Sequence, residues 1–354
     1  MTTRSVGTAQ IVTAVAAAIA LLHFLASILI PFVIAFVLAV LVNALVEFIK
    51  GRWAAAPSWA VSLLAGLVVI VLASVGIFVM AQGAVQMVSQ GPALLARLDE
   101  ILMTLGQSLH LKEPLRLSSL VGQVSIADVA GFILSGMQGL FSGLLLMVVY
   151  FGFMLAGRER ITRKVEAAAG SSSRAAAIKE TAKRIAADIE TYVWVQTITG
   201  AILTASAVAV MLAVGLHNVL FWAVVFFLLT FIPNIGVTVG SIAPSLFALI
   251  QFPTIWQAIT IFVAIQVVAT VVGNFIYPRL QAQTQNIDPV ATLLSLAFWS
   301  WLWGLPGAFL AVPMTLMSMM VFAQFESTAW VAAMLSNDGK PVFRKSVTDV
   351  PKAK

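Results

Sequence analysis

The stretch FIPNIGVTVGSIAP, residues 231–244, interrupts a long apolar segment with two prolines and two glycines. Proline has no amide hydrogen and its ring clashes with the preceding turn, so Pro233 disfavours a continuous α-helix at this point. Gly236 and Gly240 weaken a helix further. The sequence therefore predicts a helix that breaks inside hydrophobic surroundings.

The composition of the chain predicts that these surroundings are a membrane. The 354 residues are 61% hydrophobic and only 10% charged, with a mean hydropathy of +1.02, whereas soluble domains are about a quarter charged. Several stretches approach or exceed the roughly 20 apolar residues that cross a bilayer. Their Ala, Leu and Val content, without alternation of polar and apolar residues, favours helices over barrel strands. We predict an all-α, polytopic helical membrane protein.

We expect about six full spans and two broken, re-entrant-type helical hairpins. The spans are predicted at 11–30, 32–49, 59–80, 138–157, 191–214 and 255–277, and the hairpins at 219–250 and 289–325. The chain then divides into three N-terminal spans (1–80), an extracytoplasmic amphipathic helical segment (81–137), a span (138–157), a charged cytoplasmic helical linker (158–190), a transport core (191–325) and a cytoplasmic tail (326–354). The first apolar stretch runs past Pro31, beyond the roughly 7–15 residues of a signal-peptide core, so we expect an uncleaved span.

The basic residues predict the orientation of the chain. Of the 20 Lys and Arg residues, only Arg97, Lys112 and Arg116 fall in segments that would lie outside the cell. This bias follows the positive-inside rule and predicts that both termini are cytoplasmic. It also accounts for the net charge of +6 without a nucleic-acid partner. The chain has no cysteine, which excludes disulfides and thiol catalysis.

The two hairpins share a coarse design. Each reads as an apolar half-helix, a Pro/Gly break and a second half with another proline; in the second hairpin the break falls at Gly304–Gly307 and the proline is Pro313. Backbone that leaves a helix at membrane depth must be buried in protein or line a watery cavity. Paired discontinuous helices are typical of the binding site of a secondary transporter. The alternative is a purely structural kink, because Pro and Gly are common in membrane helices.

The span at 255–277 carries polar residues between these hairpins. Gln266, Thr270 and Asn274 are spaced four residues apart, so they share one helical face. They could line a solute pathway, or they could make the interhelical hydrogen bonds that buried polar groups seek in any membrane bundle.

Several segments resemble the autoinducer-2 exporter family of bacterial membrane proteins, also called PerM-like permeases. They are PFVIAFVLAVLVNALVEF (31–48), FIPNIGVTVGSIAP, GNFIYPRL (273–280) and DPVATLLSLAFWSWLWGLPGAFLAVPMT (288–315). The resemblance implies a transporter of the bacterial plasma membrane with about eight membrane segments, some members exporting autoinducer-2 and others described as sodium/proton antiporters. By this resemblance the motif positions are Pro233, Asn234, Gly236, Asn274, Pro278, Gly307 and Pro313.

Two departures from the family pattern bear on the mechanism. The chain has Asn43-Ala44 where the family often has Asn-Pro, and Tyr277 where many members carry a carboxylate before Pro278. A neutral phenol cannot exchange protons for sodium as a carboxylate does, so the second departure weakens the antiporter hypothesis.

Ionisable and catalytic residues are scarce in the apolar part of the chain. Asp288 precedes Pro289, which predicts a helix cap, with an ion carrier as the alternative. His23 lies within the first span and is expected to be a hydrogen-bonded packing residue, with a relay as the alternative. GSSSR at 170–174 does not fit a phosphate-binding loop, and no HExxH pair occurs. We therefore expect no enzymatic activity, no metal and no cofactor.

The sequence predicts a secondary transporter that exports a small polar signal or metabolite. The predicted pathway residues are Pro233, Asn234, Gly236, Gly240, Gln266, Asn274, Asp288, Gly307 and Pro313. A sodium/proton antiporter and a non-transporting scaffold that binds a partner through its external helices are the alternatives. Membrane lipid and further copies of the chain, as a homo-oligomer, are the other expected partners.

Overall fold

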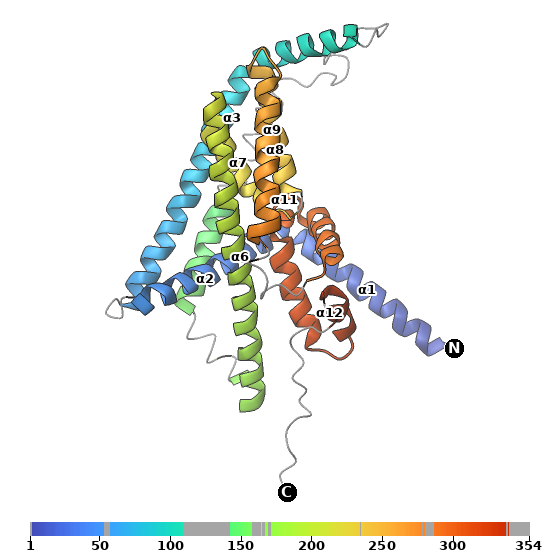
Figure 1. Cartoon of the computed structure of the whole chain (residues 1–354). Helices are drawn as coiled ribbons and strands as arrows, with labels where there is room; N and C mark the ends of the chain where they lie inside the picture. The colour runs from blue at the N-terminus through green and yellow to red at the C-terminus, as the bar shows by residue number, and fades with distance from the viewer. Residues whose placement is uncertain are drawn as a thin grey trace. The chain divides into compact units, whose positions relative to one another are not determined.

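A computed structural model describes residues 2–52, 57–108, 142–157, 171–233, 235–277 and 287–337, together with Lys164, Ala167, Ala168, Arg279 and Gly339 (Figure 1). Throughout these residues the regular elements are helices, so the predicted all-α membrane fold is confirmed. Asn234, Pro278 and the segments 109–137 and 338–354, apart from Gly339, lie outside the described residues.

The helices vary widely in length. They are α1 (Thr2–Phe24), α2 (Ala26–Arg52), α3 (Ser58–Ser108), α6 (Ser172–Val214), α7 (Val219–Thr230), α8 (Gly236–Gln251), α9 (Trp256–Val271), the π-helix η1 (Val272–Ile276), α11 (Pro289–Ala323) and α12 (Ala329–Leu335). A further apolar helix covers Ser142–Gly157. The helix breaks at Gly304 inside α11, which therefore consists of two halves.

Five helical stretches among the described residues are long and apolar enough to cross a membrane. They are Ala26–Gly51, Ala60–Met87, Ile178–Val214, Trp256–Ile276 and Pro289–Ala323. The first four correspond to predicted full spans, and the fifth contains the predicted second hairpin. The predicted spans at 11–30 and 138–157 appear as the shorter apolar helices Val12–Phe24 and Ser142–Gly157.

The boundary predicted at Pro31 between the first two spans is wrong. α1 ends at Phe24 and α2 begins at Ala26, so a single residue, Leu25, joins them, and Pro31 lies inside α2. The amide of Leu25 still donates to Leu21 O (2.9 Å), while its carbonyl accepts from the amide of Ile28 (3.0 Å). The backbone bonds thus continue through the bend, and the proline is accommodated one turn later.

Two helices continue through boundaries that the sequence suggested. α3 is 51 residues long and passes position 80 without a break, and α6 is 43 residues long and passes position 190. The apolar and amphipathic parts of each segment therefore belong to one helix, although Figure 1 shows that α3 changes direction before its end.

The chain forms two compact units, each drawn from separate parts of the sequence. The first contains residues 1–67, 143–195 and 280–354, and the second contains 68–142 and 196–279. In the first unit α11 packs against α2, α1 and α12; in the second, α8 packs against α7 and α9. Each unit holds one broken hairpin.

The second unit has a core of large apolar side chains around its hairpin. Leu203 and Met211 from α6, Trp222 and Phe226 from α7, Phe247 from α8 and Ile261 from α9 are buried together. The rings of Trp222 and Phe247 lie 5.6 Å apart between centroids. This packing fixes both halves of the hairpin against α6 and α9.

Candidate functional site

The first break lies between α7 and α8, where the sequence predicted it. Residues 231–233 and Ile235 leave the α-helix, and the amide of Ile232 bonds Leu229 O (2.9 Å) while that of Gly236 bonds Ile232 O (3.0 Å). Pro233 lies in this turn, and its carbonyl accepts from the amide of Ile235 (2.7 Å). The turn is short, so α8 restarts directly beside the end of α7.

Gly236 and Gly240 let the two halves of this hairpin approach closely. Both residues are buried, and a Cβ atom placed on Gly236 would overlap the carbonyl oxygen of Leu229. A Cβ on Gly240 would lie 2.7 Å from Cδ2 of Phe226, closer than carbon atoms pack. Any side chain at either position would push α8 away from α7.

Side chains from outside the turn satisfy the backbone at both ends of the hairpin. The Nε2 of Gln196, on α6, donates to the carbonyl of Thr230, the last residue of α7. At the other end Gln251 accepts from the amide of His217 (2.8 Å) and donates to Gly215 O (2.9 Å). Neither glutamine was predicted from the sequence to support the hairpin; the available signal was an amide side chain in an otherwise apolar helix.

The second break lies at Gly304, inside α11. This residue has φ 64° and ψ −142°, a region that is essentially restricted to glycine. Pro306 follows in the first turn of the second half, where a missing amide hydrogen costs no helical bond. Pro313 lies buried in the second half. The break predicted at Gly304–Gly307 is therefore confirmed.

Gly307 repeats the arrangement of Gly236. It is buried in the first turn after the break, and a Cβ atom on it would overlap the carbonyl oxygen of Trp299 and lie 3.0 Å from Cβ of Trp303. In both hairpins, a glycine at the start of the second half thus packs directly on the backbone of the first half.

The carbonyl before the second break is also held by another helix. Nδ1 of His23, on α1, lies 2.9 Å from the carbonyl oxygen of Leu302. In return, Nε1 of Trp303 donates to the carbonyl of Leu22 (2.9 Å). The expectation that His23 makes a hydrogen bond is confirmed, and its partner is the backbone at the break.

The polar residues of α9 bond mainly along their own helix. The Thr270 hydroxyl donates to Gln266 O (2.8 Å), and Nδ2 of Asn274 donates to Thr270 O (2.9 Å). Asn274 is exposed and lies in the π-helical turn η1. Such turns are frequent at functional sites because they reorient side chains. The sequence predicted the polar face but not the π-turn.

Asp288 caps α11, as its position before Pro289 predicted. One carboxylate oxygen accepts from the amides of Val290 (2.8 Å) and Ala291 (3.1 Å). The amide of Asp288 donates to Leu335 O at the end of α12 (3.0 Å). The carboxylate thus stabilises the start of the first half of α11.

The predicted pathway residues fall into two groups. Pro233, Gly236 and Gly240 lie in the hairpin of the second unit, which packs against the helix that carries Gln266 and Asn274. Asp288, Gly307 and Pro313 lie on α11 in the first unit. Within the described residues, each unit thus combines a broken helix with polar groups on or beside it.

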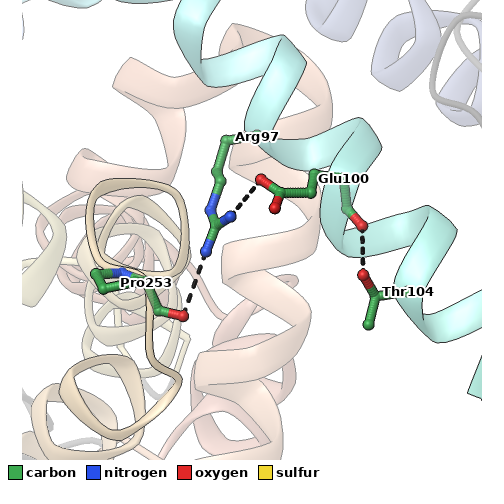
Figure 2. A network of polar contacts seen from close by, with 4 residues as sticks. All are labelled: Arg97, Glu100, Thr104 and Pro253. Carbon is green, nitrogen blue, oxygen red and sulfur yellow. Dashed lines mark hydrogen bonds and ion pairs between the residues drawn. The ribbon is translucent and has the colours of Figure 1, made fainter.

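A polar contact fixes the far part of α3 beside the loop between α8 and α9. The guanidinium of Arg97 bonds both the carboxylate of Glu100 and the carbonyl of Pro253, the latter at 3.2 Å, and the Thr104 hydroxyl donates to Glu100 O (Figure 2). The described part of the amphipathic segment therefore contacts the hairpin unit through at least this residue.

The chain is similar in sequence to a family of membrane transporters. A family model described as AI-2E family transporter matches residues 12–327. A Haemophilus influenzae protein named "Putative transport protein" is 30% identical over 223 residues, 60% of this chain and 61% of the relative. "Putative transport protein YhhT" of Escherichia coli K12 is 27% identical over 62% of this chain and 61% of its own length. "AI-2 transport protein TqsA" of the same strain is 29% identical over 132 residues, 37% of this chain and 38% of the relative. The match spans less than two thirds of each relative.

Proposed function

The chain belongs to the AI-2E transporter family, and from this premise we propose that it is a secondary transporter that exports a small polar solute across the bacterial plasma membrane. The two broken hairpins would form the moving and binding elements, with Gln266 and Asn274 beside the first of them. Family membership supports a transport role, and the geometry of the breaks supports the choice of elements.

The observation that carries this proposal is the shared construction of the breaks. In each, a side chain from another helix binds a carbonyl just before the break, Thr230 by Gln196 and Leu302 by His23. In each, a glycine then packs the second half onto the first. Broken helices held in this way expose helix ends that can bind solutes or ions near the middle of a bilayer.

The start of α8 suggests which chemical groups such a site would bind. Its N-cap residue, Ile235, has no side chain that can cap the helix. The amide of Gly236 already bonds Ile232 O, so the amides that follow it and the positive end of the helix dipole favour an oxygen atom of a ligand. Amide side chains such as those of Gln266 and Asn274 both donate and accept hydrogen bonds. A small solute with hydroxyl or carbonyl oxygens fits these groups better than a bare cation.

Autoinducer-2 is the first solute to test, because the relative TqsA is named an AI-2 transport protein. The purified chain would be reconstituted in liposomes loaded with autoinducer-2, and efflux would be followed with a reporter strain. Protein-free liposomes and a panel of small polyols and sugars complete the assay.

Two pairs of glycine substitutions test whether transport depends on the hairpins. Gly236→Ala and Gly307→Ala each place a methyl group against backbone, whereas Gly76→Ala and Gly152→Ala have only a contact at 4.0 Å or none. Overpacking costs about 1–3 kcal/mol, so the first pair should lose most of the efflux while still inserting in the membrane. The second pair should transport normally.

Normal efflux in both Gly236→Ala and Gly307→Ala would remove the breaks from the mechanism. Absence of efflux for every solute, with insertion verified, would favour the scaffold, and a sodium-driven change in internal pH would favour the antiporter.

A further inference from the structure

Two side-chain donors at the start of α7 have no hydrogen-bond acceptor. Nδ2 of Asn218, the N-cap residue, and Nε1 of Trp222, one turn later, are both buried, and neither has a partner among the described residues. Trp222 is only 8% exposed. Buried polar groups are nearly always paired, because an unpaired one loses its bonds to water without replacement. Two such donors one turn apart therefore indicate that an acceptor binds here.

The backbone at the same place adds further donors. α7 has no side-chain cap, and the amides of Val219, Leu220 and Phe221 have no acceptor within the part of the chain that the structure describes. The first bond of the helix runs from the amide of Trp222 to Asn218 O (3.1 Å). Side chains of a helix lean towards its N-terminus, so the indole of Trp222 is directed at the turn that holds these free amides.

The turn that precedes α7 is fixed in position and lies at the surface. Gln251 of α8 bonds both the amide of His217 and the carbonyl of Gly215. Asn218 has φ 58°, a left-handed conformation in which asparagine is several-fold enriched. His217 and Leu220 are exposed, so a solute can approach the start of the helix from outside the hairpin.

The chemistry of this helix start favours an anion. Each unpaired group is a donor, and the indole N–H cannot accept a hydrogen bond at all. The positive end of the helix dipole adds to their attraction for negative charge. α7, α8 and the turn 215–218 carry no Asp or Glu, so these segments offer no carboxylate that would repel an anion.

We propose that the start of α7 binds a carboxylate or phosphate group of the exported solute. The proposal rests on the transport function proposed above and narrows the solute to small organic acids and phosphate esters. The loop after α8 lies at the same end of the hairpin, and Arg97 from the far part of α3 bonds Pro253 O in that loop. By the predicted orientation this end faces outside the cell. An exported solute would meet the start of α8 first and the start of α7 last.

Binding can be measured on the indole nitrogen itself, without transport. ¹⁵N-labelled tryptophan gives one indole signal for each of the nine Trp residues, and Trp222→Phe identifies the signal of Trp222 by its loss. In maltoside micelles, which contain no phosphate, we expect a saturable shift of this signal with inorganic phosphate or succinate, and none with glycerol. The signal of Trp303, whose Nε1 already donates to Leu22 O (2.9 Å), should stay in place. No shift with either anion would overturn the proposal and leave a buried water as the acceptor.

Two substitutions at Asn218 separate the role of its side chain from that of its backbone. Asn218→Asp keeps the shape and tolerates the left-handed conformation. It replaces the donor with a negative charge, so the affinity for phosphate should fall by about tenfold or more. Asn218→Gly adopts the same φ without a side chain and should weaken binding only a few-fold. Equal affinities of the wild type and Asn218→Asp would refute the site.

Phospholipid nanodiscs distinguish a solute from a lipid headgroup, which carries the same phosphate chemistry. If the Trp222 signal in nanodiscs already has its phosphate-bound position and does not respond to succinate, a lipid occupies the site and the assignment to a solute is wrong. In liposomes loaded with succinate or inorganic phosphate, Asn218→Asp should lower efflux several-fold relative to the wild type. Saturable binding in the absence of any wild-type efflux would support the site and contradict the proposed function instead.

Discussion

At the scale of single residues, the second break depends on two glycines for different reasons. Gly307 is required by space, because the backbone of Trp299 lies where a Cβ atom would be. Gly304 has no atom within 4 Å of that position, yet its φ of 64° with ψ of −142° excludes other residues. Gly307 permits the contact between the half-helices, and Gly304 permits the change of direction.

This difference predicts how Gly304→Ala will behave. The substitution meets no steric neighbour but forces an L-residue into a strained conformation, which costs about 1–3 kcal/mol. We expect a lower temperature of unfolding in detergent and a reduced efflux. Gly273→Ala, where a Cβ atom also meets no neighbour, is the matched control. Equal unfolding temperatures for Gly304→Ala and the control would show that the break tolerates another backbone conformation.

The role of Asp288 gives a second prediction at this scale. Its carboxylate accepts from two amides at the start of α11, so Asp288→Ala should lower the free energy of unfolding by about 0.5–2 kcal/mol. Asp288→Asn retains an oxygen acceptor and should keep both stability and efflux. Chemical unfolding in detergent and the liposome assay measure the two quantities. If Asp288→Asn were stable but inactive, the carboxylate would have to carry charge rather than only cap the helix.

At the scale of helices, the carbonyl groups released by each break are bound by side chains of other helices. Gln196 of α6 binds Thr230, and Gly200, one turn later on α6, leaves room for the hydroxyl of Thr230. Without such donors the carbonyl groups would be unsatisfied in an apolar medium, where each costs several kcal/mol. The neighbouring helices thus stabilise the hairpins by supplying these hydrogen-bond donors.

Gln196→Leu should show this dependence. Removing the donor leaves a part-buried carbonyl unsatisfied, which costs about 1–3 kcal/mol, and should destabilise the end of α7. Hydrogen exchange of α7 and α8, measured by mass spectrometry, should rise in this variant. Ser206→Ala is the control on the same helix, because Ser206 bonds only its own helix at Ile202 O (2.9 Å). Unchanged exchange in Gln196→Leu would mean that the turn is held by packing alone.

The sequence predicted the breaks but not what supports them. Pro233, Gly236 and Gly304–Gly307 carry local signals, because proline and glycine act on the backbone of their own segment. Gln196 and His23 act on residues 34 and 279 positions away, and no local rule connects such partners. The boundary predicted at Pro31 was wrong for a different, local reason: the chain bends at Leu25, and the proline lies inside α2.

At the scale of the whole molecule, the two units do not follow the order of the chain. Each is assembled from separated segments, and α3 and α6 contribute residues to both. The segment boundaries predicted near 80 and 190 follow changes in polarity. A helix can continue through such a change, because its backbone hydrogen bonds do not depend on the polarity of its side chains. A change in polarity along α3 or α6 therefore does not mark the end of the helix.

The orientation of this molecule in the membrane is a prediction that the charge distribution alone supports. If the positive-inside rule holds, the far end of α3 lies outside the cell and the start of α6 lies inside. Because the chain has no cysteine, single cysteines at the exposed positions Gln107 and Ser172 can report the two sides without background. A membrane-impermeant maleimide added to intact cells should label Gln107→Cys, and it should label Ser172→Cys only after the membrane is opened. The reverse pattern would place both termini outside the cell and would overturn the predicted orientation.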